Sequence, residues 1–140
     1  MRKIFFALSL VLLFSGCSAD DEPTPRLVYE FVPIVSTNLP EEFTAGESYE
    51  LLFTYSLPTS CHNYKAINVE PLEDGSTGIG VIAYYDANKD CNEVARTAET
   101  GFDFVAGEEE FYIFKFWQGQ NEQGENQFLT VEIPVVSNSS

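Results

Sequence analysis

Cys61, His62 and Cys91 carry the side chains that most directly suggest chemistry, because thiols and imidazoles bind metals and two thiols can also pair. A structural zinc site needs four ligands, usually including a close Cys-x-x-Cys pair, and His62 is the only histidine of the chain. Outside the cytosol, a disulfide closing a loop of about thirty residues stabilises a fold by roughly 3.5 kcal/mol. We therefore predict a Cys61–Cys91 disulfide in preference to a metal site.

Oxygen-bearing side chains alternate in the stretch DANKDCNE, which gives four residues the spacing of a calcium-binding loop: Asp86, Asn88, Asp90 and Asn92. The stretch lacks the glycine and the glutamate that such a loop needs at its sixth and twelfth positions. The alternative is a hairpin loop whose Asp and Asn side chains cap their own backbone. We prefer capping, and expect no cofactor beyond this weak calcium candidate.

The stretch FYIFKFWQGQ alternates two sets of apolar side chains. If Tyr112, Phe114 and Phe116 point into a core, four residues face outward: Phe111, Ile113, Lys115 and Trp117. Aromatic residues beside the amide-rich QGQNEQ are typical of a carbohydrate or protein contact surface. The alternative, which we prefer, is that a second sheet, a loop or an edge strand covers this face, since central strands can be apolar on both sides. The four residues are kept as a possible binding surface.

No stretch of the sequence predicts catalysis. Ser60, Cys61 and His62 are adjacent, but neighbouring residues of a strand point to opposite faces, so they do not form a nucleophile and base pair. Carboxylates are abundant, yet no pattern selects the pair of acids that a glycosidase needs. We predict that the protein is not an enzyme.

The start of the chain has the layout of a signal peptide. A positive start, MRK, precedes the uncharged run IFFALSLVLLF, which is shorter than the ~18 to 20 residues of a membrane-spanning helix, and small residues follow. We predict a signal peptide over residues 1–16, a tether over 17–26, one domain over 27–136 and a tail over 137–140. Cleavage before Cys17 leaves five lysines and arginines against 22 acids, a net charge of −17. Such a charge disfavours nucleic acid as a partner.

A small residue directly before Cys17 resembles the lipobox of bacterial lipoproteins. The resemblance implies that cleavage makes Cys17 the first residue and that its thiol carries a diacylglyceryl group, which anchors the protein in a membrane. The acidic run SADDE after Cys17 resembles the signal with which Bacteroidota export lipoproteins to the cell surface. It implies a lipid-anchored protein of the outer membrane, displayed outside; the alternative is a plain tether facing the periplasm.

Period-two alternation dominates the rest of the chain. The clearest strands are YELLFTYSL and QFLTVEIPVV; LVYEFVPIV, KAINVE, IGVIAYY and FYIFKFW add four, and weaker ones are predicted over 93–98 and 102–105. Turn residues separate them, and no window has a sustained helical period. The pattern predicts an all-β fold, a single immunoglobulin-like β-sandwich of seven to eight antiparallel strands. Pro33 and Pro134 then belong on edge strands or near strand ends. Tyr112 has the place of a corner tyrosine that bonds an upstream backbone group; the alternative is a buried core tyrosine with any other hydrogen-bond partner.

The stretches GCSADDE, LPTSC with the second cysteine, and FYIFKFWQGQNEQGENQFLTVEIPV together resemble small Bacteroidota surface lipoproteins with an immunoglobulin-like domain. The resemblance implies a binding or structural module of the cell envelope with a protein or carbohydrate partner, and brings no catalytic residues. The alternatives are an extracellular carbohydrate-binding accessory protein and, further off, an enzyme or inhibitor acting outside the cell.

Overall fold

The computed structural model describes residues 24–138, which form nine β-strands and no helix. The strands are β1 (Leu27–Val32), β2 (Ile34–Asn38), β3 (Phe43–Thr44), β4 (Ser48–Leu57), β5 (Asn63–Pro71), β6 (Thr77–Asp86), β7 (Arg96–Val105), β8 (Phe111–Gln120) and β9 (Asn126–Val136). This part of the chain has no helix able to cross a membrane. The predicted signal peptide, Cys17 and the acidic run Asp20, Asp21 and Glu22 lie outside the described residues.

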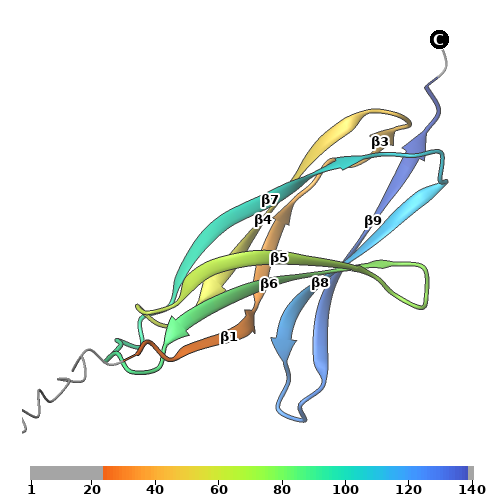
Figure 1. Cartoon of the computed structure of the whole chain (residues 1–140). Helices are drawn as coiled ribbons and strands as arrows, with labels where there is room; N and C mark the ends of the chain where they lie inside the picture. Colours follow the sequence, from red (N-terminus) through yellow and green to blue (C-terminus); the bar gives the residue numbers. More distant parts are fainter. Residues whose placement is uncertain (1–23, 139–140) are drawn as a thin grey trace, which may run out of the picture.

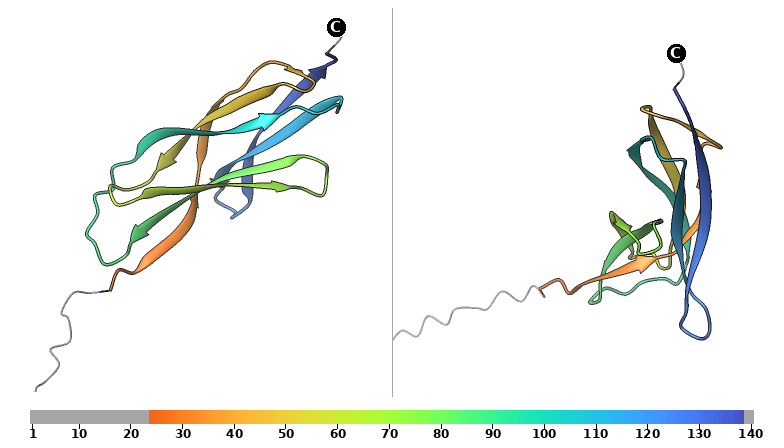
Figure 2. Two further views of the ribbon diagram at one scale, coloured as in Figure 1. Left: turned by 45° about the horizontal axis from the view of Figure 1, so that its top comes forward. Right: turned by 90° about the vertical axis from the view of Figure 1, so that its right-hand side faces the viewer.

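The strands form two sheets that pack as the layers of a β-sandwich (Figure 1, Figure 2). The larger sheet has the order β1-β6-β8-β9-β3, with β5 paired to β6, and the smaller sheet has the order β2-β4-β7. The prediction of an all-β sandwich is therefore confirmed. The immunoglobulin-like topology within that class stays a prediction.

The predicted number and direction of the strands were partly wrong. Pro33 cannot donate to a ladder, and the chain passes there from β1 in one sheet to β2 in the other, so LVYEFVPIV forms two strands. Only residues 96–98 of the stretch 93–98 are in a strand, and they form one strand, β7, with the stretch 102–105, which continues through Gly101 opposite Leu52. Two pairings are parallel, β6 with β8 and β3 with β9, and in both the chain crosses to other strands before it returns in the same direction.

The core is built by the alternation that the sequence shows. Leu51, Phe53, Tyr55 and Leu57 of β4 are buried, while the residues between them are half-buried. Phe114 and Phe116 of β8 face them, fully buried. Replacing such a buried ring by alanine costs about 3 to 5 kcal/mol in a typical core.

Tyr112 lies beside this core, with its ring 4.9 Å from that of Phe104. Its hydroxyl accepts a hydrogen bond of 2.8 Å from the backbone N–H of Gly107, five residues upstream. This is the contact expected of a corner tyrosine.

Strand β6 is the centre of the larger sheet. One of its edges pairs with β5 along its length, from Thr77 to Tyr84. The other edge is shared: β8 pairs in parallel with Thr77–Ile79, and β1 pairs antiparallel with Val81–Asp86. Strands β1 and β8 therefore follow one another along the same edge of β6, and this arrangement builds the site described next.

Candidate functional site

A cavity of about 310 Å³ lies on the outer face of the larger sheet, on the side away from the core. Its apolar wall consists of three aromatic rings from three strands: Phe31 of β1, Trp117 of β8 and Phe128 of β9. Four polar side chains also line it: Asn68 and Glu70 of β5, Gln120 of β8 and Asn126 of β9. Leu72, Gly78, Ile79 and Gly80 complete the lining. We call this cavity and the residues that line it the aromatic groove.

The three rings meet because of strand order and register. Since β1 and β8 follow one another on β6, the rings of Phe31 and Trp117 lie 5.9 Å apart between centroids, tilted by 59°. Phe128 is the direct partner of Trp117 in the β8–β9 pairing. Phe31 and Phe128 are 48% and 44% exposed, so both rings remain accessible to a ligand.

Glycines of β6 allow side chains of neighbouring strands to lie close to the sheet. A β-carbon at Gly80 would be 2.9 Å from two ring carbons of Phe31, which is closer than real β-carbons approach. A β-carbon at Gly78 would be 3.2 to 3.3 Å from the side chain of Leu72. The alternating glycines of TGIGV therefore form the floor of the groove, and glycine in a strand is a signal of such close approach.

Some polar side chains at the rim of the groove are hydrogen-bonded to other residues of the protein, and others are free to bind a ligand. Asn126 Oδ1 accepts from Trp117 Nε1 at 3.1 Å and from Gln120 Nε2 at 3.3 Å, which orients the indole. On the opposite side, the side chains of Asn68 and Glu70 make no hydrogen bond to residues 24–138, and they flank the outward-facing Gly80 and Gly78. Amides and a carboxylate therefore line the groove on both sides.

The structure places all four residues of the predicted binding surface on the outer face of β8. Only Trp117 lines the groove; Phe111 is 45% exposed and lies toward the other end of the strand. Ile113, Lys115 and Trp117 are half-buried and Phe111 is exposed, so this face is partly covered. Our preferred interpretation, that another element covers it, stays a prediction.

Lys115 points toward the β5–β6 hairpin and donates a 2.5 Å hydrogen bond to Asp74 Oδ2. This bond, with those donated by the hydroxyl and backbone N–H of Ser76, holds the pKa of Asp74 well below its usual range. Lys115 is thus paired beside the groove and is not part of its lining.

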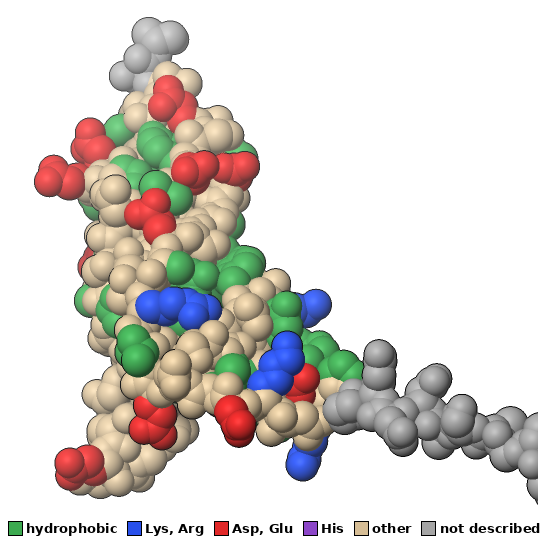
Figure 3. Space-filling model, turned by 90° about the vertical axis from the view of Figure 1, so that its left-hand side faces the viewer, with side chains coloured by type: hydrophobic (Ala, Val, Ile, Leu, Met, Phe, Trp, Pro, Cys, Tyr) green, Lys and Arg blue, Asp and Glu red, His purple; other side chains and the backbone are tan. Residues whose placement is uncertain are grey.

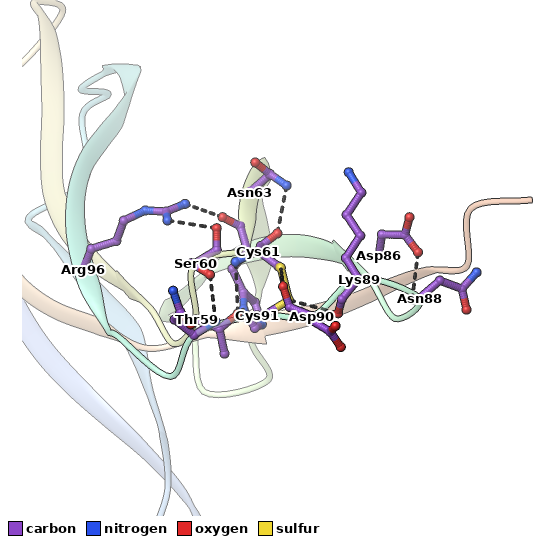
Figure 4. Close-up of a disulfide and its surroundings, with 12 residues drawn as sticks. Thr59, Ser60, Cys61, Asn63, Asp86, Asn88, Lys89, Asp90, Cys91 and Arg96 are labelled. Atoms are coloured by element: carbon purple, nitrogen blue, oxygen red, sulfur yellow. Dashed lines mark hydrogen bonds between the residues drawn. A yellow bond between two sulfur atoms is a disulfide. The ribbon is translucent and has the colours of Figure 1, made fainter. Parts of the chain in front are cut away.

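The predicted disulfide is confirmed: Cys61 and Cys91 are bonded, with their α-carbons 5.5 Å apart (Figure 4). The bridge joins the turn after β4 to the loop after β6. Ser60 and Asn92 reinforce it, since Ser60 N donates to Asn92 O at 3.0 Å and Asn92 N donates to Ser60 Oγ at 2.9 Å. The metal interpretation of the two cysteines with His62 is therefore wrong.

His62 beside the bridge is buried, with Nδ1 2.7 Å from Thr59 Oγ1 and Nε2 2.5 Å from Glu30 Oε1. A histidine between a hydroxyl and a carboxylate has the order of a catalytic triad. However, the Thr59 hydroxyl also accepts a hydrogen bond from Cys61 N at 3.2 Å. Thr59, His62 and Glu30 are not among the residues that line the aromatic groove. We assign the cluster to structure: it ties β1 to the turn after β4. The sequence did not indicate Thr59 or Glu30.

The calcium candidate forms a capped loop. Asp86 Oδ1 accepts from the backbone N–H of Asn88 at 3.0 Å and from that of Arg26 at 3.2 Å, and Asn88 Nδ2 donates to Thr24 O. Residues 24–138 contain no group of three His, Cys, Asp or Glu side chains placed to share a metal ion. Calcium binding by Asp86, Asn88, Asp90 and Asn92 was the alternative to capping, and it stays untested. Through Asp86 and Asn88, this loop holds Thr24 and Arg26, which precede β1.

Charge is unevenly distributed over the domain. On the face shown in Figure 3, the side chains near the C-terminal end carry acidic groups and no lysine or arginine, whereas lysines and arginines lie with acidic groups nearer the start of the described chain. A second cavity at the C-terminal end, of about 620 Å³, has Glu108, Glu109 and Glu110 in its lining.

Comparison with known protein families gives one match, in which the prokaryotic membrane lipoprotein lipid attachment site matches residues 1–18. No curated protein and no solved structure matches the chain. The match includes Cys17 and agrees with the predicted anchor. The protein is thus a membrane-anchored lipoprotein that carries an all-β sandwich with one disulfide.

Proposed function

We propose that this lipoprotein is a binding module of the cell envelope, held in the outer membrane, displayed at the cell surface, and taking its ligand in the aromatic groove. The observation that carries the proposal is the meeting of Phe31, Trp117 and Phe128 around a cavity of about 310 Å³. Ligand sites are typically concave, largely apolar and supplied with a few polar groups, at volumes from about 300 Å³ upward.

The lining supports binding over catalysis. Glu70 is its one ionisable side chain, whereas hydrolysis of a glycosidic bond normally needs two carboxyl groups on either side of that bond. The lining contains no histidine, cysteine or lysine to serve as a base or nucleophile. An immunoglobulin-like sandwich, supported by the Tyr112–Gly107 contact, suits such a module as well.

The groove can be tested through Trp117, which is the only tryptophan and therefore the only source of indole emission. Lipidated protein in zwitterionic vesicles is titrated with polysaccharide and protein fractions of the envelope. We expect a saturable emission change with at least one fraction. Phe128→Ala should weaken it about tenfold or more, because a buried phenyl ring contributes about 1.5 to 3 kcal/mol.

Phe111→Ala is the matched control, since this ring is exposed to a similar extent on the same face but outside the groove. It should leave the titration unchanged. Equal losses in Phe111→Ala and Phe128→Ala would count against the groove, and no response to any fraction would refute the binding proposal.

Surface display depends on the acidic run after Cys17. Changing Asp20, Asp21 and Glu22 together to alanine should leave the protein lipidated and membrane-bound but hidden from external protease. Accessibility to protease on intact cells is compared with that of the unchanged protein, and a variant with Ser18→Ala serves as control. If the triple variant is cleaved as readily as the control, the run is a tether and display has another cause.

A further inference from the structure

We infer that the ligand of the aromatic groove is an uncharged glycan chain, bound through stacking of its sugar rings on Trp117 and Phe128. This inference rests on the proposed function and names the chemical class that the same site accepts.

The rings of the groove match the apolar faces of sugars. The face of an aromatic ring carries partial negative charge, and the C–H groups on one face of a pyranose carry partial positive charge, so the two surfaces attract as they exclude water. Trp117 and Phe128 are neighbours across two paired strands, which gives two adjacent stacking positions. Phe31, tilted by 59° from Trp117, closes one side.

The polar rim matches hydroxyl groups. Asn68 offers both donors and an acceptor, and Glu70 offers acceptors, with no partner for either within residues 24–138. Asn126 uses its Oδ1 within the protein, and its side-chain N–H groups donate no hydrogen bond within residues 24–138. Hydroxyls both donate and accept, so a sugar satisfies all three side chains at once.

Charge selects against acidic ligands. The lining holds one carboxylate and no lysine or arginine, and Lys115 beside it is paired with Asp74. Phosphate, sulfate or uronate groups would approach Glu70 on a domain that is strongly acidic overall, which costs free energy. An uncharged glycan meets no such repulsion.

A peptide strand fits the groove less well. Extended peptides gain affinity by pairing with an unpaired sheet edge. The floor strand β6 is paired on both sides, by β5 on one edge and by β8 and β1 on the other, so the floor of the groove offers no unpaired main-chain edge. Recognition here must come from side chains.

The test titrates lipidated protein in zwitterionic vesicles with uncharged oligosaccharides of four to six hexose or N-acetylhexosamine units, in α and β linkage. We expect a saturable change in Trp117 emission with at least one linkage type, and an affinity that is constant between low and high salt. Phe31→Ala and Phe128→Ala should each weaken binding about tenfold or more, as measured by calorimetry. Asn68→Ala should weaken it about five- to tenfold.

Gln123→Ala is the matched control for the amide, because Gln123 lies in the β8–β9 hairpin outside the groove, and it should leave affinity unchanged. Binding that is confined to acidic oligosaccharides, or that falls steeply with salt, would overturn the inference. If envelope protein gives a response that Phe128→Ala removes and no glycan does, the groove binds a protein: the glycan assignment then fails while the binding module stands. If no fraction and no glycan changes the Trp117 emission, both the glycan assignment and the binding module are refuted.

Discussion

Loss of the thiol at position 17 should move the protein from the membrane to the soluble fraction of the envelope while leaving the sandwich folded. Each buried methylene of an acyl chain contributes about 0.8 kcal/mol, so two or three chains account for stable attachment. The described residues offer no helix that could replace them. The anchor is also separate from the core, whose residues begin at Val32. We therefore expect nearly complete release from Cys17→Ala.

The variant should be made with residues 1–16 replaced by an ordinary secretory signal peptide, because an uncleaved apolar leader would itself hold the chain in the membrane. Fractionation after a salt wash gives the distribution, and the melting curve shows whether the fold is intact. Ser18→Ala with the native leader is the control and should remain bound. Retention of the Cys17→Ala protein in washed membranes would contradict the lipid anchor.

The elements that the sequence predicted well are those with one buried face. In β4 and β8, alternation of apolar and polar side chains follows the two-residue period of a strand that covers a core, so their existence and orientation were evident. Pro33 was recognised as a position near a strand end for an equally local reason, its missing N–H. Such features depend on residues close in sequence.

The aromatic groove depends on pairings between distant residues. Phe31 and Trp117 are neighbours only because β1 and β8 share one edge of β6, and no local pattern encodes that order. The sequence therefore indicated Trp117 but not Phe31 or Phe128. One signal was available: Gly78 and Gly80 alternate on the outward face of a strand, which predicts close approach by side chains from other strands.

The disulfide was predictable for a different reason. With Cys17 committed to lipid, Cys61 and Cys91 were the remaining thiols, so the choice of partner needed no knowledge of the fold. The sequence did not reveal what the bridge supports. In the structure the buried His62 follows Cys61 directly and contacts Glu30 and Thr59.

Removing this bridge should lower the free energy of unfolding about as much as removing a buried aromatic ring from the core. Closing a loop between residues 30 apart in sequence lowers the entropy of the unfolded chain by an amount worth about 3.5 kcal/mol. For a domain of this size the melting temperature should fall by roughly 10 to 15 °C. The double variant Cys61→Ala with Cys91→Ala should nevertheless fold, because neither cysteine belongs to the buried core and the Ser60–Asn92 hydrogen bonds remain.

Thermal melting followed by circular dichroism, with and without a reductant, measures this effect. The reductant should lower the melting temperature of the native protein to that of the double variant and should not change the double variant itself, which controls for other actions of the reagent. Thiol titration of the oxidised protein should find no reactive cysteine, since Cys17 carries lipid and the other two are bonded. A melting temperature that the reductant shifts by less than about 2 °C would mean that the loop is already restricted in the unfolded chain, and that the native bonds around Ser60 and His62, not the bridge, hold this end of the sandwich together.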